Sequence, residues 1–338
     1  MLNFVTLFDR NYLSRGLALY DSLEKECNDS FLLFILCMDE ESYLYFSEKK
    51  MKNISLIKLD EIEAFYPVLL KLKQERSRGE YCWTLTPFSI QYILKTTNIS
   101  MCTYLDADLY FFNSPKCLLD ELPDDKSVLI TEHNYTPCYD QSLTSGKYCV
   151  QFMVFKNDLN GGDVLEWWRH QCELWCYNRM EGGKFGDQKY LDDWTTRFTS
   201  VYVSKNEGAG VAPWNMQKFD IFRLSEEFFI RNTITKKESK VVFVHFHNLK
   251  PINNTKWHVG DYSISEDFKF LVYKPYIRKI LEIEQFLSEN LKSKIMVKYK
   301  SVFWNLLFAT KIALGRYIKD IYKILKGNYC VNLTKDTK

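Results

Sequence analysis

The chain has 338 residues, a formal net charge of +2 and 16% aromatic residues. This length allows one large domain or two smaller ones, and the near balance of charge argues against a nucleic-acid-binding protein. No run of 18 apolar residues occurs, so no membrane-spanning helix is predicted. The first nine residues lack the basic and apolar regions of a signal peptide.

The first 60 residues alternate between apolar strands and an amphipathic helix. Strands are predicted over 4–8, 31–37 and 55–59, with a helix over 13–23 and a helix start at Asp39. Strand–helix–strand alternation predicts a parallel sheet with crossover helices. Ligands of such sheets bind beyond the carboxyl ends of the strands.

A helix and then one long strand are predicted next. Thr86 as N-cap and Pro87 at the first helical position predict a helix that ends at Thr96. The apolar run over 101–112 is predicted as a single strand, ended by the turn residues of 113–115. The later expected elements are a helix over 114–122, strands over 127–131 and 148–155, a helix over 164–180, a glycine-rich loop over 181–189 and a strand over 241–246.

Two carboxylates, Asp106 and Asp108, interrupt the predicted strand. Residues two apart on a strand point to the same side, so these carboxylates would repel each other unless a cation lies between them. Mg²⁺ and Mn²⁺ prefer carboxylate oxygens as ligands, and their remaining coordination positions bind substrate phosphates. Downstream, His245 ends an apolar run and is a candidate third ligand. Lys250 follows five residues later and is a candidate contact for a diphosphate.

Simpler interpretations of these residues exist. An isolated pair of aspartates is usually a solvated strand end, and a single histidine near a strand end is usually structural. The combination of the pair with the downstream histidine favours a metal site.

Residues 1 to about 265 resemble the GT-A nucleotide-sugar transferases, in particular glycosyltransferase family 8 and related bacterial enzymes of surface-polysaccharide assembly. The resemblance implies an α/β fold with a Rossmann-like, mixed and mostly parallel sheet flanked by helices. It implies a transferase domain over 1–270. The segment 275–330 lies outside the match, and its own pattern predicts a basic amphipathic helical extension. The matching segments are 4–12, 104–109, 148–155, 186–188, 209–215 and 245–250.

The resemblance also implies the residues of a site. Asp106, Asp108 and His245 would hold Mn²⁺ or Mg²⁺, and Asp187 and Gln188 would lie near the anomeric carbon. Contacts with the nucleotide-sugar are expected from Thr6, Phe8, Asp9, Tyr12, Ala107, Gln151, Asn215 and Lys250.

Three departures from the family pattern concern the donor site. Cys149 and Gln151 stand where Asn and Gly are usual, which predicts different contacts to the donor sugar. Asn248 replaces a Gly and Lys250 comes one residue early. The segment 83–86 lacks the Arg that family members often carry for the diphosphate.

The implied activity is transfer of a hexosyl unit from a nucleotide-diphosphate sugar, most simply a UDP-sugar, to a hydroxyl of a glycan or glycolipid. The resemblance favours retention of configuration and a role in cell-surface polysaccharide synthesis. A sugar nucleotidyltransferase is a rival, although the segment after the first strand is not glycine-rich as its phosphate loop would be. Two further rivals are a non-catalytic carbohydrate-binding protein on a transferase fold and a metal-dependent hydrolase.

Ten cysteines are scattered through the chain, several of them in apolar runs. This usage predicts reduced, buried thiols in a cytoplasmic protein. Contact with the cytoplasmic face of the inner membrane is a separate expectation, which depends on the basic C-terminal segment. Cys172 and Cys176 are placed four apart on a predicted helix, near His170. A zinc site would need two further ligands, and none is evident at a suitable spacing.

The C-terminal segment 290–327 carries nine basic residues and one acidic residue. Its apolar residues recur largely at three- or four-residue steps, which predicts a basic amphipathic helix. Such a helix binds an anionic membrane surface or packs on the catalytic domain with its basic face in water, and the sequence leaves both open.

Overall fold

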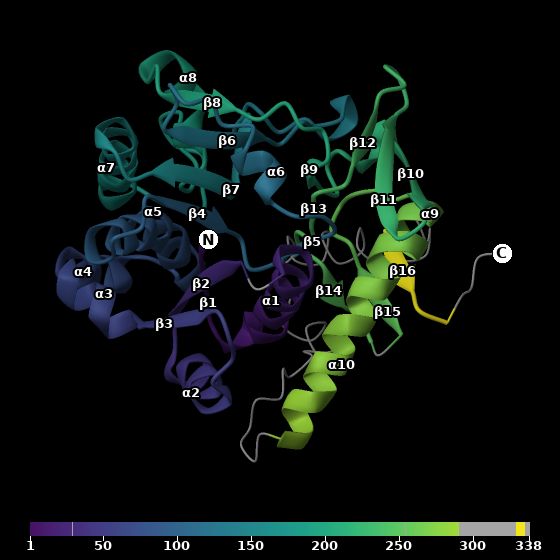
Figure 1. Cartoon of the computed structure of the whole chain (residues 1–338), viewed down its shortest axis with the longest axis horizontal. Helices are drawn as coiled ribbons and strands as arrows, with labels where there is room; N and C mark the ends of the chain where they lie inside the picture. Colours follow the sequence, from purple (N-terminus) through teal and green to yellow (C-terminus); the bar gives the residue numbers. More distant parts are fainter. Residues whose placement is uncertain (29, 254, 291–328, 335–338) are drawn as a thin grey trace, which may run out of the picture.

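The computed structural model describes residues 1–28, 30–253, 255–290 and 329–334 (Figure 1). Its centre is a seven-stranded sheet in the order β3-β2-β1-β4-β7-β6-β8. β7 runs opposite to its two neighbours, and the other neighbouring strands are parallel. The mixed, mostly parallel sheet predicted from the sequence is therefore confirmed. The strands are β1 (Leu2–Phe8), β2 (Phe31–Cys37), β3 (Ile54–Lys58), β4 (Met101–Leu105), β6 (Val128–Glu132), β7 (Tyr148–Lys156) and β8 (Val201–Val203).

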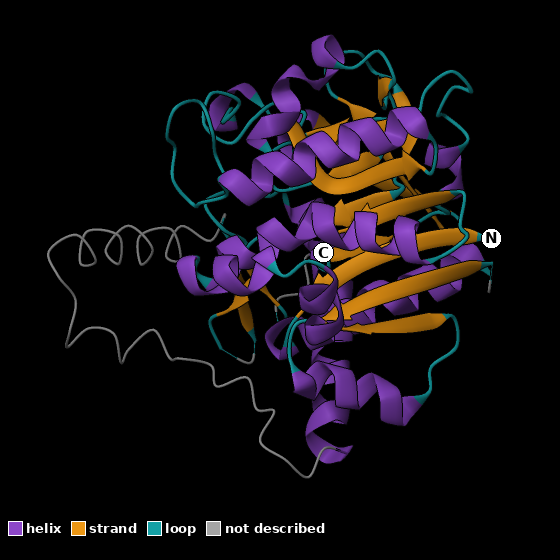
Figure 2. Ribbon diagram, turned by 90° about the vertical axis from the view of Figure 1, so that its left-hand side faces the viewer, coloured by secondary structure: helices purple, strands orange, loops and turns teal. Residues whose placement is uncertain are grey.

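Helices cover both faces of this sheet (Figure 2). Val5 and Leu7 of β1 belong to a core that includes side chains of α5 and α7, whereas Phe4 and Phe8 belong to a core shared with α1. Alternate residues of a strand thus bury opposite faces, as a doubly covered sheet requires. The helices are α1 (Leu13–Cys27), α2 (Glu40–Lys49), α3 (Leu59–Phe65), α4 (Val68–Glu75), α5 (Arg78–Thr96), α6 (Lys116–Leu119), α7 (Leu159–Leu174) and α8 (Trp194–Arg197).

Three small sheets adjoin the central one, in the orders β5-β13-β9, β10-β11-β12 and β14-β15-β16. Together with the C-terminal helices they enclose a third core, in which aromatic side chains such as Trp214, Phe246 and Tyr273 pack with aliphatic ones. The elements are β5 (Leu109–Phe111), β9 (Ala209–Val211), β10 (Phe219–Leu224), β11 (Glu227–Asn232), β12 (Glu238–Lys240), β13 (Phe243–His245), β14 (Lys250–Pro251), β15 (Lys256–His258), β16 (Cys330–Asn332), α9 (Glu266–Phe268) and α10 (Lys274–Asn290).

The predicted start of the long central helix was wrong. Helix α5 begins at Arg78, because Ser77 and Glu80 form a reciprocal capping box that satisfies its first N–H groups. Pro87 lies inside the helix instead of at its first position. A proline there removes one backbone hydrogen bond, and here the helix continues through it to Thr96.

The single strand predicted over 101–112 was also wrong. β4 ends at Leu105, residues 106–108 form a turn, and β5 begins at Leu109 in a different sheet. The two aspartates therefore lie on a turn between two sheets, so strand alternation is not what brings them together. Shorter or shifted elements replace three other predictions: α6 for 114–122, α7 for 164–180 and β13 for 241–246.

Helix α10 is part of the folded body rather than a detached extension. It packs along α1 (Figure 1). Its residues Tyr276, Ile277 and Ile280 are buried, and the Tyr276 ring stacks on Phe246 with ring centroids 3.7 Å apart. The basic segment predicted over 290–327 lies almost wholly outside the described residues. No helix in the described ranges has the length and apolar character needed to cross a bilayer.

Replacing Ile277 by alanine is expected to lower the free energy of unfolding by about 2–5 kcal/mol, the usual cost of emptying a buried aliphatic site. Ile234 is 84% exposed, and its replacement by alanine should change that free energy by less than about 0.5 kcal/mol. Urea unfolding of both variants measures the difference. Equal midpoints for the two would show that α10 does not support the core.

Candidate metal and nucleotide site

Strand pairing assembles the predicted metal ligands. β5 pairs antiparallel with β13, and this register sets His245 opposite Leu109, the residue after Asp108. The N–H of Phe246 donates to the Asp108 carbonyl at 3.0 Å, and the N–H of Asp106 donates to the Gln151 carbonyl at 3.0 Å. Backbone bonds from two separate strands therefore fix the turn that carries both aspartates.

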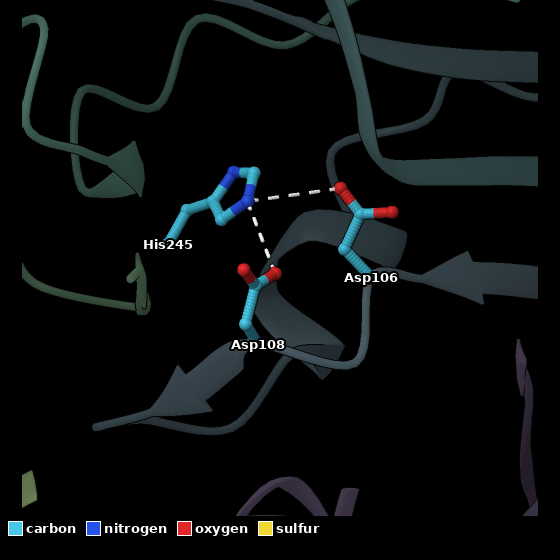
Figure 3. A group of neighbouring side chains, drawn as sticks. All are labelled: Asp106, Asp108 and His245. Atoms are coloured by element: carbon cyan, nitrogen blue, oxygen red, sulfur yellow. Dashed lines mark ion pairs between the residues drawn. The ribbon is translucent and has the colours of Figure 1, made fainter. Parts of the chain in front are cut away.

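The side chains of Asp106, Asp108 and His245 converge on one point (Figure 3). The His245 Nε2 atom lies 3.1 Å from Asp108 Oδ1 and 3.8 Å from Asp106 Oδ2. One ligand atom from each residue lies within 4.8 Å of the others, and this is the only such group of three among the described residues. Two carboxylates and an imidazole are donors that suit a divalent cation such as Mn²⁺. The residues therefore fit a metal.

Burial and mutual charge perturb all three groups. Burial raises the pKa of Asp106 to about 6. The charge of His245 opposes this rise, and the charge of Asp108 adds to it. Against the effect of burial, the charge and hydrogen bond of His245 lower the pKa of Asp108 to about 2. Again against burial, Asp108 raises the pKa of His245 well above its ordinary value. The charges of these three groups therefore act strongly on one another.

Gln151 orients the imidazole from behind. Its Oε1 lies 2.8 Å from His245 Nδ1, and its Nε2 donates to Thr131 Oγ1 at 3.2 Å. The bond to Nδ1 leaves Nε2 facing the carboxylates, a common arrangement around metal-ligating histidines. Gln151 is completely buried in this structure. The sequence signal for this role was a glutamine in the middle of β7, where the other residues over 150–155 are all apolar.

Asp187 adds a third carboxyl near the cluster. It is 6% exposed, and its carbonyl accepts a hydrogen bond from Trp168 Nε1 at 2.8 Å. Burial and the charge of Asp106 raise the pKa of Asp187 to about 8. Gln188 follows it, half-buried, at the start of the short helix over 189–193.

The raised pKa of Asp187 predicts a pH dependence of stability. In EDTA the folded protein holds this proton more tightly than the unfolded chain, so stability falls as the pH rises from about 4 to about 8. Asp187→Asn should remove this contribution, which reaches about 1.4 kcal/mol per pH unit. Urea unfolding at four pH values tests it, with Asp163→Asn, an exposed carboxyl on α7, as control. Parallel curves for wild type and Asp187→Asn would contradict it.

Asp9 and Tyr12 follow the carboxyl end of β1, and Tyr12 lies near the cluster. Tyr12 is 42% exposed, and the charge of Asp108 is the largest cause that raises the pKa of its hydroxyl to about 12. Asp9 forms an ion pair with Arg78, with 2.6 Å between Asp9 Oδ2 and Arg78 Nε. The structure thus places Tyr12 beside the cluster and Asp9 at the edge of the same sheet.

Three more of the residues expected to contact the nucleotide-sugar are buried, as Gln151 is. Thr6 is fully buried in β1, and Phe8 packs in the core beside α1. Asn215 is also buried, and its amide bonds the carbonyls of His133 and Gly210 at 2.9 Å. Ala107 sits between the two aspartates and is 7% exposed.

Lys250 opens β14 with its side chain exposed. The preceding Asn248 has a φ of 57°, the left-handed conformation that glycine favours and asparagine tolerates. The turn is therefore formed with asparagine in place of the expected glycine. Trp214 packs edge-on against both His245 and His247, with ring centroids 5.3 and 5.4 Å apart, and was not identified from the sequence as part of this site.

The ten cysteines are all free, and every one lies in a described range. Cys172 lies within α7, but the helix ends at Leu174, before Cys176. The predicted common helix face for this pair is therefore absent.

Solved structures share this architecture. The galactosyltransferase LgtC, in complex with donor and acceptor sugar analogs, aligns with a TM-score of 0.50 and 15% identity, over 83% of this chain and 96% of that one. The bifunctional glycosyltransferase WbbM aligns with a TM-score of 0.53 and 14% identity, over 84% of this chain and 51% of that one. The fold is the GT-A fold of glycosyltransferases.

No protein-family model matches the sequence. The uncharacterized protein YfnF of Bacillus subtilis (strain 168) is 34% identical over 219 residues, which are 63% of this chain and 71% of YfnF. At this identity and coverage, the chain belongs to the same family as YfnF.

Proposed function

We propose that the protein is a metal-dependent glycosyltransferase that moves a hexosyl unit from a nucleotide-diphosphate sugar to a hydroxyl of a glycan or glycolipid. The observation that carries the proposal is the cluster of Asp106, Asp108 and His245 at the carboxyl edge of the sheet in a GT-A fold. Ligands of such sheets bind at this edge. LgtC, which has this fold, binds donor and acceptor sugar analogs.

Asp106, Asp108 and His245 would hold the cation, Mn²⁺ or Mg²⁺. A bound divalent cation neutralises negative charge on a departing diphosphate. Gln151 keeps the His245 Nε2 atom directed toward the carboxylates. Tyr12 and Asp9 lie on the side of the cluster where the nucleoside is proposed to bind, and UDP is the proposed nucleotide.

Asp187 and Gln188 are the proposed residues at the reacting carbon. The pKa of Asp187, raised to about 8, is close to neutral pH, and a pKa near the working pH favours proton transfer. Asp187 would take the proton of the acceptor hydroxyl in an inverting reaction. In the retaining reaction, which the family resemblance favours, Asp187 or Gln188 would stabilise the positive charge that develops at the anomeric carbon.

The test is calorimetric binding of UDP, GDP and CDP, each with Mn²⁺ and with EDTA. Tight binding of one nucleotide with Mn²⁺ and its loss in EDTA is the expected result. Release of that nucleotide from its diphosphate sugar, accelerated by an acceptor, would then separate a transferase from a hydrolase. A folded protein that binds none of the three would overturn the proposal in favour of a carbohydrate-binding protein.

The proposed setting is the synthesis of cell-surface polysaccharide in the cytoplasm. The free cysteines support a reducing compartment. The basic segment 290–327 is proposed to contact anionic lipid at the inner membrane. Co-sedimentation of the full chain with phosphatidylserine vesicles at low and high salt tests this contact, and equal recovery with neutral vesicles would refute it.

A further inference from the structure

A cation that the sequence patterns did not reveal lies beside the metal cluster. Arg15 is in the first turn of α1, and its guanidinium carbon lies 4.9 Å from the centroid of the Tyr12 ring. Its Nη2 atom donates to the Leu249 carbonyl at 2.9 Å. The guanidinium is therefore fixed between the start of α1 and the loop that runs from His245 to Lys250.

The loop that holds Arg15 is fixed to the turn of the metal cluster. The Leu249 N–H donates to the Phe246 carbonyl at 3.2 Å, and the Phe246 N–H donates to the Asp108 carbonyl at 3.0 Å. The Leu249 carbonyl that accepts from Arg15 therefore belongs to a segment that is bonded to the turn of Asp106 and Asp108.

Arg15 has no carboxylate partner in the described part of the chain. Other arginines, such as Arg10, Arg78 and Arg169, pair with carboxylates at 2.6 Å. Arg15 is only partly exposed, and its one hydrogen bond to protein uses a single N–H group of the five that a guanidinium carries. Lys250, next to Leu249, likewise has no ion pair among the described residues.

The position of Arg15 also opposes the local helix field. The N-terminal turn of a helix carries partial positive charge, so a cation there is unfavourable unless an anion is nearby. Arg15, Lys250 and the start of α1 thus present positive charge at one side of the metal cluster.

We propose that Arg15, together with Lys250, binds the diphosphate of the donor and stabilises its charge when it leaves the sugar. This inference rests on the proposed function. It assigns to Arg15 on α1 the contact with the diphosphate that family members often make with an arginine in the segment that corresponds to 83–86. A guanidinium binds phosphate oxygens through two parallel N–H groups, and Tyr12 and Leu249 hold this one in place.

The test compares affinities for UDP, GDP or CDP, whichever binds with Mn²⁺, and for the matching nucleoside without phosphate. Arg15→Gln should weaken binding of the diphosphate at least about 10-fold, as expected for loss of a charge-assisted contact. It should leave binding of the nucleoside and of Mn²⁺ alone unchanged. Arg15→Lys should restore part of the diphosphate affinity, and Arg278→Gln, an exposed arginine on α10, should behave as wild type.

Each outcome separates the possibilities. Equal diphosphate affinity for Arg15→Gln and wild type would overturn the role of Arg15 and leave the proposed function standing. Equal losses for nucleoside and diphosphate would show that Arg15 only supports the loop at Leu249, which also overturns the role. Absence of diphosphate binding by the wild type would overturn the proposed function and this inference with it. Thermal unfolding of each variant confirms that the compared proteins are folded.

Discussion

Replacing Asp108 by asparagine is expected to abolish metal-dependent nucleotide binding while the protein stays folded. Asp108 Oδ1 is the carboxylate oxygen 3.1 Å from His245 Nε2, so it would be a direct ligand of the cation. An amide oxygen is neutral and offers weaker attraction to a divalent ion. We expect a loss of several kcal/mol of binding free energy, which corresponds to an affinity at least about 100-fold weaker. Calorimetry with Mn²⁺ and the nucleotide that binds wild type measures it.

The fold should survive this change because the backbone holds the turn. The Asp108 carbonyl accepts from Phe246, and neither partner in that bond is a side chain. Asp125→Asn is the matched control, since its carboxylate is 76% exposed and lies in the loop before β6. Retained Mn²⁺-dependent binding by Asp108→Asn would show that Asp108 is not a ligand. An unfolded variant would show that the carboxylate is structural.

Replacing Gly210 by alanine is expected to damage the site without touching any ligand. Gly210 has a φ of 86°, a conformation that residues with a side chain rarely adopt. An added Cβ would lie 2.3 Å from the Nε2 atom of Gln151. The amide that orients His245 would therefore be displaced. We expect a 10- to 100-fold loss of Mn²⁺ affinity, which is about the effect of removing a partner of a metal-ligating histidine.

Backbone strain and the clash should also lower the free energy of unfolding, by about 1–3 kcal/mol. Gly162→Ala is the matched control, because an added Cβ there meets nothing within 4 Å and the residue is within helix α7. Alanine at a helical glycine is expected to stabilise by up to about 1 kcal/mol. Gln151→Met separates the two effects, since it removes the amide and leaves the backbone of residue 210 unchanged. Normal Mn²⁺ affinity in both Gly210→Ala and Gln151→Met would exclude a role for this amide.

Local sequence signals determined much of the fold and pointed to the centre of the site. Apolar runs predicted β1, β2 and β3 to within two residues, because a strand buried on both faces has few polar positions. Asp39 ended one such run and caps α2 as predicted, since its short side chain accepts the Ser42 N–H. The aspartate pair and His245 were identified because polar groups that follow apolar strands are unusual and chemically specific.

Tertiary structure decided how those residues meet. The distances among Asp106, Asp108 and His245 depend on the pairing of β5 with β13, which joins segments more than 130 residues apart, and no local pattern contains that register. The long apolar run over 101–112 gave no sign that its halves enter different sheets. The positions of Gln151 and Arg15 depend on hydrogen bonds to residues distant in the chain, His245 and Leu249. Composition and periodicity specify which residues are buried or polar, whereas pairing between distant strands specifies which polar residues share a site.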